Sequence, residues 1–427
     1  MPHPFVIILG KAVRHAARLR GGGSALPGLF VEKISPDFIK QTLAQLPRGV
    51  VVISGTNGKT TTTKMVVALL EAHGLKVFTN RTGSNFTRGV AAALLGDIDI
   101  KGNLDADISV LELDEAHAVH FVHAIPPKYS LLLNVMRDQL DRFGEIDATA
   151  KMLEKIALAT TDTVVLNRED RRVLAIKDSL ADQKNNTKVE LFGLSDALLA
   201  DFPSDDEMRG GTVKAAERPT ATVILEKYSG NQATYQLDGQ KFTTALKLNG
   251  VYNVFNSAAA IALARAILGE EVHTDVLIST IATVTPAFGR GEELQIGGQP
   301  LELVLVKNPS GFRLGLKSFS PAGYATMIAI NDNYADGRDM SWLWDVDFES
   351  LTELGVSEVS GVRAYDMALR LQYDEVVIGH IERDLPFALR QFINTNKDTP
   401  KRIYCTYTAM LALRKELGKM TKVEVIS

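Results

Sequence analysis

"GVVVISGTNGKTTTTKM", residues 49–65, begins with an apolar run that leads into a glycine-rich turn and then a helix-like segment. A strand, a glycine-rich turn and a helix in this order are typical of a phosphate-binding loop. The common form of that loop has four residues between its first glycine and the Gly-Lys-Ser/Thr triplet, which would put the first glycine at Ile53. Here the first glycine is Gly55, two residues later. We therefore predict a shortened phosphate loop between a strand at 49–54 and a helix at about 59–73.

Each residue type in this loop has a chemical reason to contact a nucleotide. Gly55 and Gly58 permit the tight turns that aim backbone N–H groups at phosphate oxygens, and the following helix adds its positive N-terminal end. Lys59 would reach the β- and γ-phosphates, and the Thr60 hydroxyl would hold Mg²⁺. A glycine-rich turn beside an unrelated Lys-Thr pair is the alternative, which the flanking strand and helix disfavour. The predicted nucleotide-binding residues are Gly55, Thr56, Asn57, Gly58, Lys59, Thr60 and Thr61.

Short apolar strands alternate with helical stretches on the C-terminal side of the loop. Strands are expected at 76–80, 106–113, 129–135 and 161–167, with a helix at 149–160. This alternation is typical of a doubly wound α/β sheet with parallel strands.

Two further blocks follow this predicted sheet. Residues 195–245 contain β-branched runs joined by "SGN" and "LDGQ" turns, which predicts a small antiparallel insertion. A helix is expected at 251–268. A second block, from residue 297, shows strands at 301–308, 324–332 and 374–380 and helices at 361–372 and 407–419. The expected parts are an N-terminal segment (1–48), a central ATP-binding domain (49–296) and a smaller C-terminal α/β domain (297–427).

The composition excludes some classes of function. Of the 427 residues, 45% are apolar and 23% are charged, which is ordinary for a globular protein with sizeable cores. The net charge of −4 argues against a general nucleic-acid binder. Cys405 is the only cysteine, so the chain can form neither an internal disulfide nor a cysteine zinc site. This fits a reducing cytoplasm.

The N-terminal residues carry a short apolar run followed by cationic residues. A signal peptide has the reverse order, and no apolar stretch is long enough to span a membrane, so we expect a cytoplasmic protein. The segment "KAVRHAARLR" (11–20) predicts a short basic helix with two interpretations. We favour a solvated face on a docking helix, and the alternative is contact with anionic lipid headgroups at the inner face of the membrane.

An acidic segment follows one of the predicted strands, at the edge where doubly wound sheets bind ligands. In "VLELDEAH" (110–117), Glu112 lies at the end of the strand, and Asp114 and Glu115 come directly after it. Mg²⁺ takes hard oxygen ligands, commonly one or two carboxylates with phosphates and water. A magnesium site and a solvated acidic loop both agree with this pattern.

A second polar segment, "NVMRDQLDRFG" (134–144), follows the next strand. Asn134, Asp138 and Asp141 are suited to a cation or to a phosphate-bearing intermediate. The alternative is the polar start of a helix, with Asp138 and Arg142 as an ion pair four residues apart.

Amide side chains and an arginine mark two positions further along. Asn253 and Asn256 lie three residues apart on one face of the helix predicted from 251. Amides can give and accept hydrogen bonds at an adenine edge, although a helix cap with tight alanine packing is an equally simple explanation. Arg290, in "FGRGEEL" (288–294), lies in a predicted turn from which it could clamp a transferring phosphoryl group.

The densest polar segment is "INDNYADGRDMSWLWDVDFE" (330–349), directly after a predicted strand. Its aspartates and tryptophans are Asp332, Asp336, Asp339, Asp345, Asp347, Trp342 and Trp344. A turn with tryptophan packing is one explanation. Five aspartates beside two bulky aromatic residues on a single loop favour a functional site.

These motifs together resemble those of the Mur ligases and folylpolyglutamate synthases, ATP-dependent enzymes that activate a carboxylate as an acyl phosphate which an amine then attacks. The resemblance rests on the short loop "GTNGKT", on Glu112, and on the asparagine-bearing helix followed by "GR". It implies a Mur-ligase-type α/β fold in which Lys59 and Thr60 hold phosphate and Mg²⁺. It also implies that Glu112 binds Mg²⁺, that Asn253 lies at the nucleotide and that Arg290 contacts phosphates.

The departures from that pattern narrow the resemblance to the MurT subunits of lipid II isoglutaminyl synthases. The Mur pattern "DHLD" is "DQLD" here (138–141), and the C-terminal part has "VKNPSGF" (306–312) in place of the usual amino-acid recognition signature. The resemblance implies amidation of the D-glutamate α-carboxyl in the stem peptide of lipid II. Ammonia would come from a partner of the GatD kind, a class I glutamine amidotransferase. The four-cysteine zinc ribbon of many members cannot form here, and 195–219 marks its expected place.

The resemblance also implies that an aspartate of the C-terminal domain orients the partner's Cys-His pair. Asp339 is our first candidate, followed by Asp336 and Asp345, and spacing alone does not choose among them. Cys405 has no nucleophile elbow around it and is expected to be a buried small hydrophobic residue. Two other functions stay open: a ligase that adds an amino acid, as folylpolyglutamate synthase does, and a nucleotide-binding scaffold that has lost its chemistry.

Overall fold

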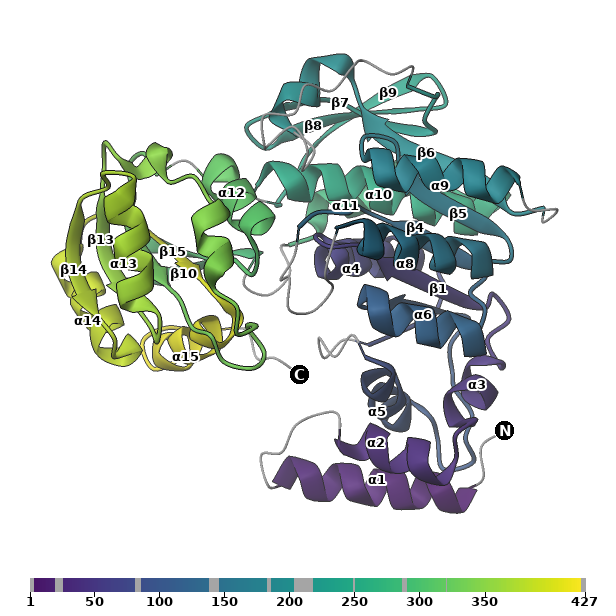
Figure 1. The fold of residues 1–427 in the computed structure, drawn as a ribbon. Coiled ribbons are helices and arrows are strands. Elements are labelled where there is room, and N and C mark those ends of the chain that lie inside the picture. The colour runs from purple at the N-terminus through teal and green to yellow at the C-terminus, as the bar shows by residue number, and fades with distance from the viewer. Residues whose placement is uncertain are drawn as a thin grey trace.

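Two α/β units and a layer of N-terminal helices make up the fold (Figure 1). The structure is a computed structural model. It describes residues 4–19, 26–80, 86–137, 146–182, 186–202, 218–248, 250–285, 290–319 and 321–423. The side chains of 16–19 and of Arg290 lie outside this description.

The larger unit is built on a nine-stranded sheet with the order β2-β3-β1-β4-β5-β6-β7-β8-β9. Strands β2 to β7 are parallel, and β7, β8 and β9 pair antiparallel. The expected antiparallel insertion therefore extends the main sheet. The strands are β1 (Val50–Ser54), β2 (Val77–Thr79), β3 (Ile108–Glu112), β4 (Tyr129–Leu132), β5 (Thr163–Asn167), β6 (Lys188–Leu194), β7 (Val223–Ser229), β8 (Gln232–Leu237) and β9 (Gln240–Ala245).

Helices cover both faces of this sheet. The strands β1, β3, β4 and β5 are therefore buried along their whole length. One face packs against α4 (Lys59–Ala72), α10 (Val251–Leu268) and α11 (Thr274–Thr283). The other face packs against α5 (Thr87–Asp97), α6 (Glu115–Ala124), α8 (Ile146–Ala159) and α9 (Arg171–Ala181). Two short 3₁₀ turns, η1 (Asp196–Asp201) and η3 (Gly269–Glu271), complete the unit.

The stretch Val251–Glu271, formed by α10 and η3, is the only helical stretch in the described part of the chain that is long and apolar enough to cross a membrane. Of its most apolar 18 residues, 72% are buried, and α10 packs against the sheet and α4. Its apolarity therefore belongs to a core helix.

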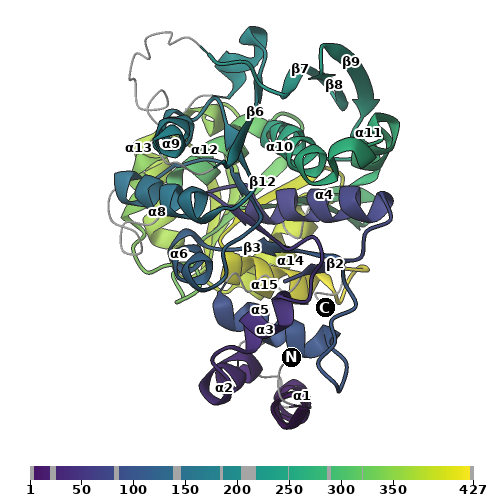
Figure 2. The same ribbon diagram turned by 90° about the vertical axis from the view of Figure 1, so that its right-hand side faces the viewer.

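The N-terminal residues form α1 (Pro4–Leu19), α2 (Leu26–Ile34) and α3 (Phe38–Leu43). Helices α1 and α2 pack on each other and on α5, so they form a layer beyond the sheet and its helices (Figures 1 and 2). Residues 11–19 of the predicted basic helix form the second half of α1, and Arg20 lies outside the described residues.

The smaller unit has a six-stranded sheet with the order β10-β11-β15-β12-β13-β14, parallel except for the β10–β11 hairpin. Its strands are β10 (Arg290–Ile296), β11 (Gln299–Leu305), β12 (Ala325–Ala329), β13 (Val356–Ser360), β14 (Ile378–Glu382) and β15 (Lys401–Cys405). Helices α12 (Pro309–Ser318) and α13 (Ala364–Tyr373) pack on one face with η4 (Ser341–Asp345) and η5 (Glu349–Leu351). Helices α14 (Leu385–Thr395) and α15 (Tyr407–Leu417) pack on the other.

The doubly wound α/β prediction is confirmed, and the differences are local. The predicted domain boundary at 297 falls in the turn of the β10–β11 hairpin, so β10 belongs to the C-terminal sheet. The strand predicted at 374–380 begins at Ile378. Residues 374–377 instead leave α13 through a turn, with Glu375 in the left-handed region at φ 59°.

Candidate active site

The predicted phosphate loop connects β1 to α4, and its two glycines adopt positive φ angles. Gly55 has φ 133° and Gly58 has φ 91°, a region that L-residues with side chains disfavour. A Cβ atom on Gly58 would lie 2.7 Å from Oδ1 of Asn256 on α10. The backbone of the loop therefore approaches α10 at a position where only glycine fits.

The loop is fastened to the end of the neighbouring strand β4 by reciprocal hydrogen bonds. The Asn57 N–H donates to Oδ1 of Asn134 at 2.9 Å, and the Asn134 side-chain amide donates back to the Asn57 carbonyl at 2.9 Å. The Thr56 N–H donates to the Asn134 carbonyl, and the Met136 N–H donates to the Thr56 hydroxyl at 3.0 Å. Asn134 thus positions the loop, whereas the accompanying candidates Asp138 and Asp141 lie outside the described residues.

Asp170 supports this arrangement from behind. As the N-cap of α9 it accepts hydrogen bonds from the N–H groups of Arg172 and Val173, and its other oxygen accepts from the Val135 N–H at 2.6 Å. Part of the residue reaches solvent, but the carboxyl group is enclosed by these N–H groups, and its burial raises the pKa of Asp170 to about 6. The segment that carries Asn134 is therefore held by a buried cap.

Lys59 is folded back into the loop and paired with a buried carboxylate. Its Nζ donates to the Gly55 carbonyl at 2.5 Å and lies 3.5 Å from Oε1 of Glu115. The two side chains are 6% and 2% exposed. Among the described residues, neither carboxylate oxygen of Glu115 accepts a hydrogen bond, so Lys59 is its counter-charge.

A hydroxyl and a carboxylate meet at the start of α4. The Thr60 hydroxyl donates to Oε1 of Glu112 at 2.9 Å. Asn80 fixes the backbone of Glu112 from both sides, because its amide donates to the Glu112 carbonyl and its Oδ1 accepts the Glu112 N–H. Two hard oxygen donors at the end of a phosphate loop are the ligand type that Mg²⁺ prefers, so the residues fit this ion.

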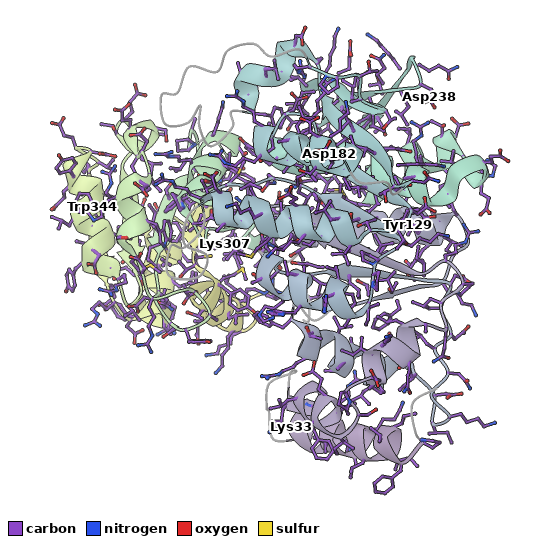
Figure 3. The ribbon with its side chains drawn as sticks, turned by 45° about the vertical axis from the view of Figure 1, so that its right-hand side comes forward. Lys33, Tyr129, Asp182, Asp238, Lys307 and Trp344 are labelled. Carbon is purple, nitrogen blue, oxygen red and sulfur yellow. The ribbon has the colours of Figure 1, made fainter. Side chains whose placement is uncertain are left out.

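A cleft beside the loop is lined from both units of the chain. The larger unit supplies Gly58, Asn253 and Asn256, and the smaller one supplies Lys307 and Phe319. Figure 3 shows Lys307 on the side of the smaller unit that faces the larger one. The complete lining is Asn57, Gly58, Gly250, Tyr252, Asn253, Asn256, Val304, Leu305, Lys307, Gly311, Leu314, Gly315, Ser318 and Phe319.

The two units meet directly at the loop through a pair of asparagines. Asn308 caps α12, where its Oδ1 accepts the Gly311 N–H at 2.6 Å. Its side-chain amide also donates to Oδ1 of Asn57 at 3.4 Å. The cap of a helix in the smaller unit is thus tied to the phosphate loop of the larger one.

The other predicted loop residues occupy different environments. Thr61 is fully buried in the first turn of α4. Arg290 begins β10, where its backbone pairs with Val304, but its side chain and residues 286–289 lie outside the described residues. The predicted arginine contact to phosphate therefore stays a prediction.

The candidate aspartates of the smaller unit are separated by their surroundings. Asp336 is 3% exposed and accepts hydrogen bonds from the N–H and hydroxyl of Thr408 at the start of α15, at 2.7 and 2.5 Å. Its burial raises the pKa of Asp336. Asp339 is partly exposed and accepts the Ser341 N–H at 2.9 Å, and its hydrogen bonds to Ser341 lower the pKa of Asp339. Asp345 is also partly exposed, at the end of η4.

The two tryptophans on this segment have different roles in packing. Trp342 is buried, with its ring against Phe312 of α12. Trp344 is 49% exposed and packs edge-on against Tyr373 of α13, with the Arg370 guanidinium 5.5 Å from the Trp344 ring centre. Trp342 belongs to the core, as the simpler explanation predicts, whereas Trp344 leaves an aromatic face open to solvent.

Sequence reasoning left several supporting residues without a role. Asn308 had a readable signal, because Asn followed by Pro is a common helix start. Asp170 likewise precedes a helix with no other cap. Glu115 was noted only as a neighbour of Glu112, and no spacing rule points it at Lys59.

Comparison with known proteins identifies the family and the fold. Residues 53–264 match the family model described as Mur ligase middle domain, and residues 305–410 match the one described as MurT ligase C-terminal. The lipid II isoglutaminyl synthase (glutamine-hydrolyzing) subunit MurT of Streptococcus pneumoniae is 31% identical, over 96% of both chains. Among solved structures, MurF from Acinetobacter baumannii aligns with a TM-score of 0.68 at 18% identity, over 92% of this chain and 80% of that one. MurF from Thermotoga maritima in complex with ADP aligns with a TM-score of 0.64 at 18% identity, over 90% and 84%.

Proposed function

The chain belongs to the family of MurT subunits, ATP-dependent ligases with the Mur ligase fold, and we propose that it amidates the α-carboxyl of D-glutamate in the lipid II stem peptide. The observation that carries the proposal is the Thr60–Glu112 contact at the end of the shortened loop, beside a cleft lined by both units. This contact supports the proposal because phosphoryl transfer to a carboxylate would need a metal-binding pair beside the phosphates.

ATP would lie along the loop with its phosphates on the N–H groups at the start of α4. The positive end of α4 and the Lys59 ammonium favour the negative charge of the phosphates. Thr60 and Glu112 would hold Mg²⁺, which when bound neutralises charge on the β- and γ-phosphates. Asn253 and Asn256, on the wall of the cleft, would contact the nucleotide.

The Lys59–Glu115 pair adds a condition to nucleotide binding. Lys59 donates to the Gly55 carbonyl and faces Glu115 within the loop. To reach a β- or γ-phosphate it would exchange at least the Gly55 contact for a phosphate oxygen. Glu115 would then remain the neighbour of Lys59 on the side away from the phosphate.

The reaction would proceed in two steps. An oxygen of the D-glutamate carboxylate attacks the γ-phosphorus, the bond to the β-phosphate oxygen breaks, and ADP leaves. Ammonia then attacks the carbonyl carbon of the acyl phosphate, phosphate leaves, and loss of a proton from nitrogen gives the amide. Lys59 would stabilise the charge that spreads over the transferred group, and Arg290 is proposed for the same role.

A partner would supply the ammonia. The relative from Streptococcus pneumoniae is named as the MurT subunit of a glutamine-hydrolyzing synthase, which implies a second subunit for that protein. Cys405, the only cysteine of this chain, is fully buried, and burial raises the pKa of its thiol, so it is unsuited to attack glutamine. We propose a GatD-like class I glutamine amidotransferase as the partner.

The smaller unit offers a surface for that partner. Tyr365, Leu369 and Tyr373 are exposed at every fourth position of α13, and Trp344 continues the same apolar surface by its contact with Tyr373. Of the three aspartates, Asp339 would orient the partner's Cys-His pair. It is partly exposed with a lowered pKa, whereas Asp336 is committed to Thr408.

The test is mass spectrometry of lipid II incubated with this chain, its amidotransferase partner, ATP, Mg²⁺ and glutamine. Conversion of one carboxylate to an amide, lost in Lys59→Ala and Glu112→Gln but kept in Lys64→Ala, would support the proposal. Lys64 is a matched control because it is a lysine of the same helix whose Nζ donates a hydrogen bond to the Thr285 hydroxyl, outside the phosphate loop. Incorporation of an amino acid in place of ammonia would identify an amino-acid ligase. ATP binding without ATP consumption in the presence of lipid II would favour the scaffold.

A parallel reaction with ammonium chloride in place of glutamine separates the ligase from its partner. Leu369→Asp and Asp339→Asn should lose the glutamine-dependent reaction and keep the ammonium-dependent one. Loss of both reactions would exclude a role for these residues that is confined to the partner.

A further inference from the structure

An exposed apolar stripe lies on α1. Phe5 and Ile8 are 64% and 59% exposed, and Ala12 is exposed on the same face one turn later. The neighbouring residues Val6 and Ile7 turn inward and are buried. The helix therefore uses one apolar face for packing and keeps a second one in solvent.

The inward face of α1 is closely fitted, so the exposed stripe is not a consequence of loose packing. A Cβ atom on Gly10 would lie 2.8 Å from side-chain carbons of both Leu95 on α5 and Val31 on α2. Lys11 turns inward as well, and its Nζ donates to the carbonyl of Ile98 at the end of α5, at 2.6 Å. The orientation of α1, and hence the direction of its outer stripe, is fixed by these contacts.

Helix α2 extends the exposed surface. Leu26 at its start and Ile34 at its end are 56% and 45% exposed. Figures 1 and 2 show α1 and α2 side by side as the outermost layer of the molecule, on the far side of α5 from the sheet. Phe5, Ile8, Leu26 and Ile34 thus lie on a layer that has no described element outside it; we call these four residues the α1–α2 face.

The N-terminal part of the sequence has a net charge opposite to that of the rest of the chain. Residues 1–34 contain five lysines or arginines and one glutamate, a net charge of +4. The remaining residues contain 42 cationic and 50 acidic side chains, a net charge of −8. Lys33 on α2 is exposed, and the half-exposed Arg88 on α5 lies 3.5 Å from the Glu32 carboxylate, so of these two cations Lys33 is the one that this layer leaves open to solvent. Exposed apolar residues bordered by cations are the composition of helices that lie in a membrane interface.

We propose that the α1–α2 face docks the chain on an anionic lipid bilayer, with its four apolar side chains in the headgroup region and nearby cations on lipid phosphates. The inference rests on the proposed function, because a substrate held in a bilayer has to be met at its surface. A second copy of this chain fits less well, since face-to-face contact would bring together two N-terminal segments, each with a net charge of +4 over residues 1–34. Lysine and arginine near the surface favour anionic lipids instead.

The experiment is flotation of the full chain with vesicles of phosphatidylcholine alone or with phosphatidylglycerol, without lipid II and without ATP. The wild type should bind the mixed vesicles, bind the zwitterionic ones far more weakly, and detach as salt is raised. Phe5→Ser/Ile8→Ser should weaken binding to mixed vesicles by about tenfold or more, because the anchoring area is lost. The matched control is Tyr365→Ser/Leu369→Ser, which removes an equally exposed apolar pair from α13 and should bind as the wild type does.

Three results would overturn the inference. One is equal vesicle binding by the wild type and the α1 variant, with circular dichroism showing that both are folded. Another is equal loss in the α13 control. The third is a dimer in size-exclusion chromatography that only the α1 variant breaks, which would assign the face to a second copy. Because the vesicles contain no substrate, these results do not depend on whether lipid II is amidated.

Discussion

Nζ of Lys59 lies 3.5 Å from Oε1 of Glu115, and both side chains are buried beneath the phosphate loop. A buried ion pair costs desolvation on both sides, so removal of one partner leaves the other charge uncompensated. The pair therefore links the stability of the loop to the charge that a nucleotide brings.

Glu115→Gln should destabilise the chain without nucleotide by about 2 to 4 kcal/mol, because Lys59 loses its counter-charge in a buried site. ATP with Mg²⁺ should recover part of this loss, since phosphate then supplies the negative charge. Urea unfolding with and without nucleotide measures both values. Asp105→Asn is the control: because its pair with Lys76 is exposed to solvent, the substitution should leave stability almost unchanged, with or without nucleotide. Equal effects of the two substitutions would contradict the prediction.

Gly58→Ala should lower the stability of the chain through backbone strain and through a clash with Asn256, and a substitution at Gly230 measures the strain alone. Gly230 has φ 59° and no atom within 4 Å of the place a Cβ would take, whereas Gly58 has φ 91° and its Cβ would meet Asn256 at 2.7 Å. Gly230→Ala should therefore cost only the backbone strain, about 1 kcal/mol. Gly58→Ala should cost more and should also weaken ATP binding, measured by calorimetry. An unchanged ATP affinity would show that the loop adjusts to the methyl group.

Asn308→Ala should affect the nucleotide site from the other unit. Loss of its cap on α12 should cost about 1 kcal/mol, as should Asp384→Ala at the matching cap of α14, where Asp384 accepts the Phe387 N–H. Only Asn308→Ala removes a contact to Asn57, so only this variant should raise the KM for ATP. A similar rise in Asp384→Ala would trace the effect to stability alone.

The pH dependence of stability should contain a contribution from Asp170, whose pKa is raised to about 6 by burial. A raised pKa means that the folded state holds the proton more tightly, so this contribution to stability is present at low pH and is lost as pH rises through about 6. Relative to Asp170→Asn, the wild type should gain about 2 to 3 kcal/mol between pH 7 and pH 4. Urea unfolding of both proteins at several pH values gives this difference. A difference that does not change with pH would show that the pKa of the Asp170 carboxyl is not raised.

The sequence by itself determined the position of the phosphate loop and the alternation of strands and helices around it. Gly55, Gly58, Lys59 and Thr60 act through their spacing within one turn, and the short apolar runs on the C-terminal side of the loop form buried strands. These properties depend on neighbouring residues in the chain, so they could be read without a structure. The burial of Cys405 was also predictable, because it lies in an apolar strand.

Only the tertiary structure decided which distant side chains meet at the site. Asn308 contacts Asn57, 251 residues away in the sequence. Asp336 accepts hydrogen bonds from Thr408, 72 residues away. Likewise, β7 joins the main sheet beside β6, so the antiparallel strands extend it. The reason is physical: a hydrogen bond or an ion pair depends on distances of a few ångströms, which the packing of whole helices and strands sets and no local pattern encodes.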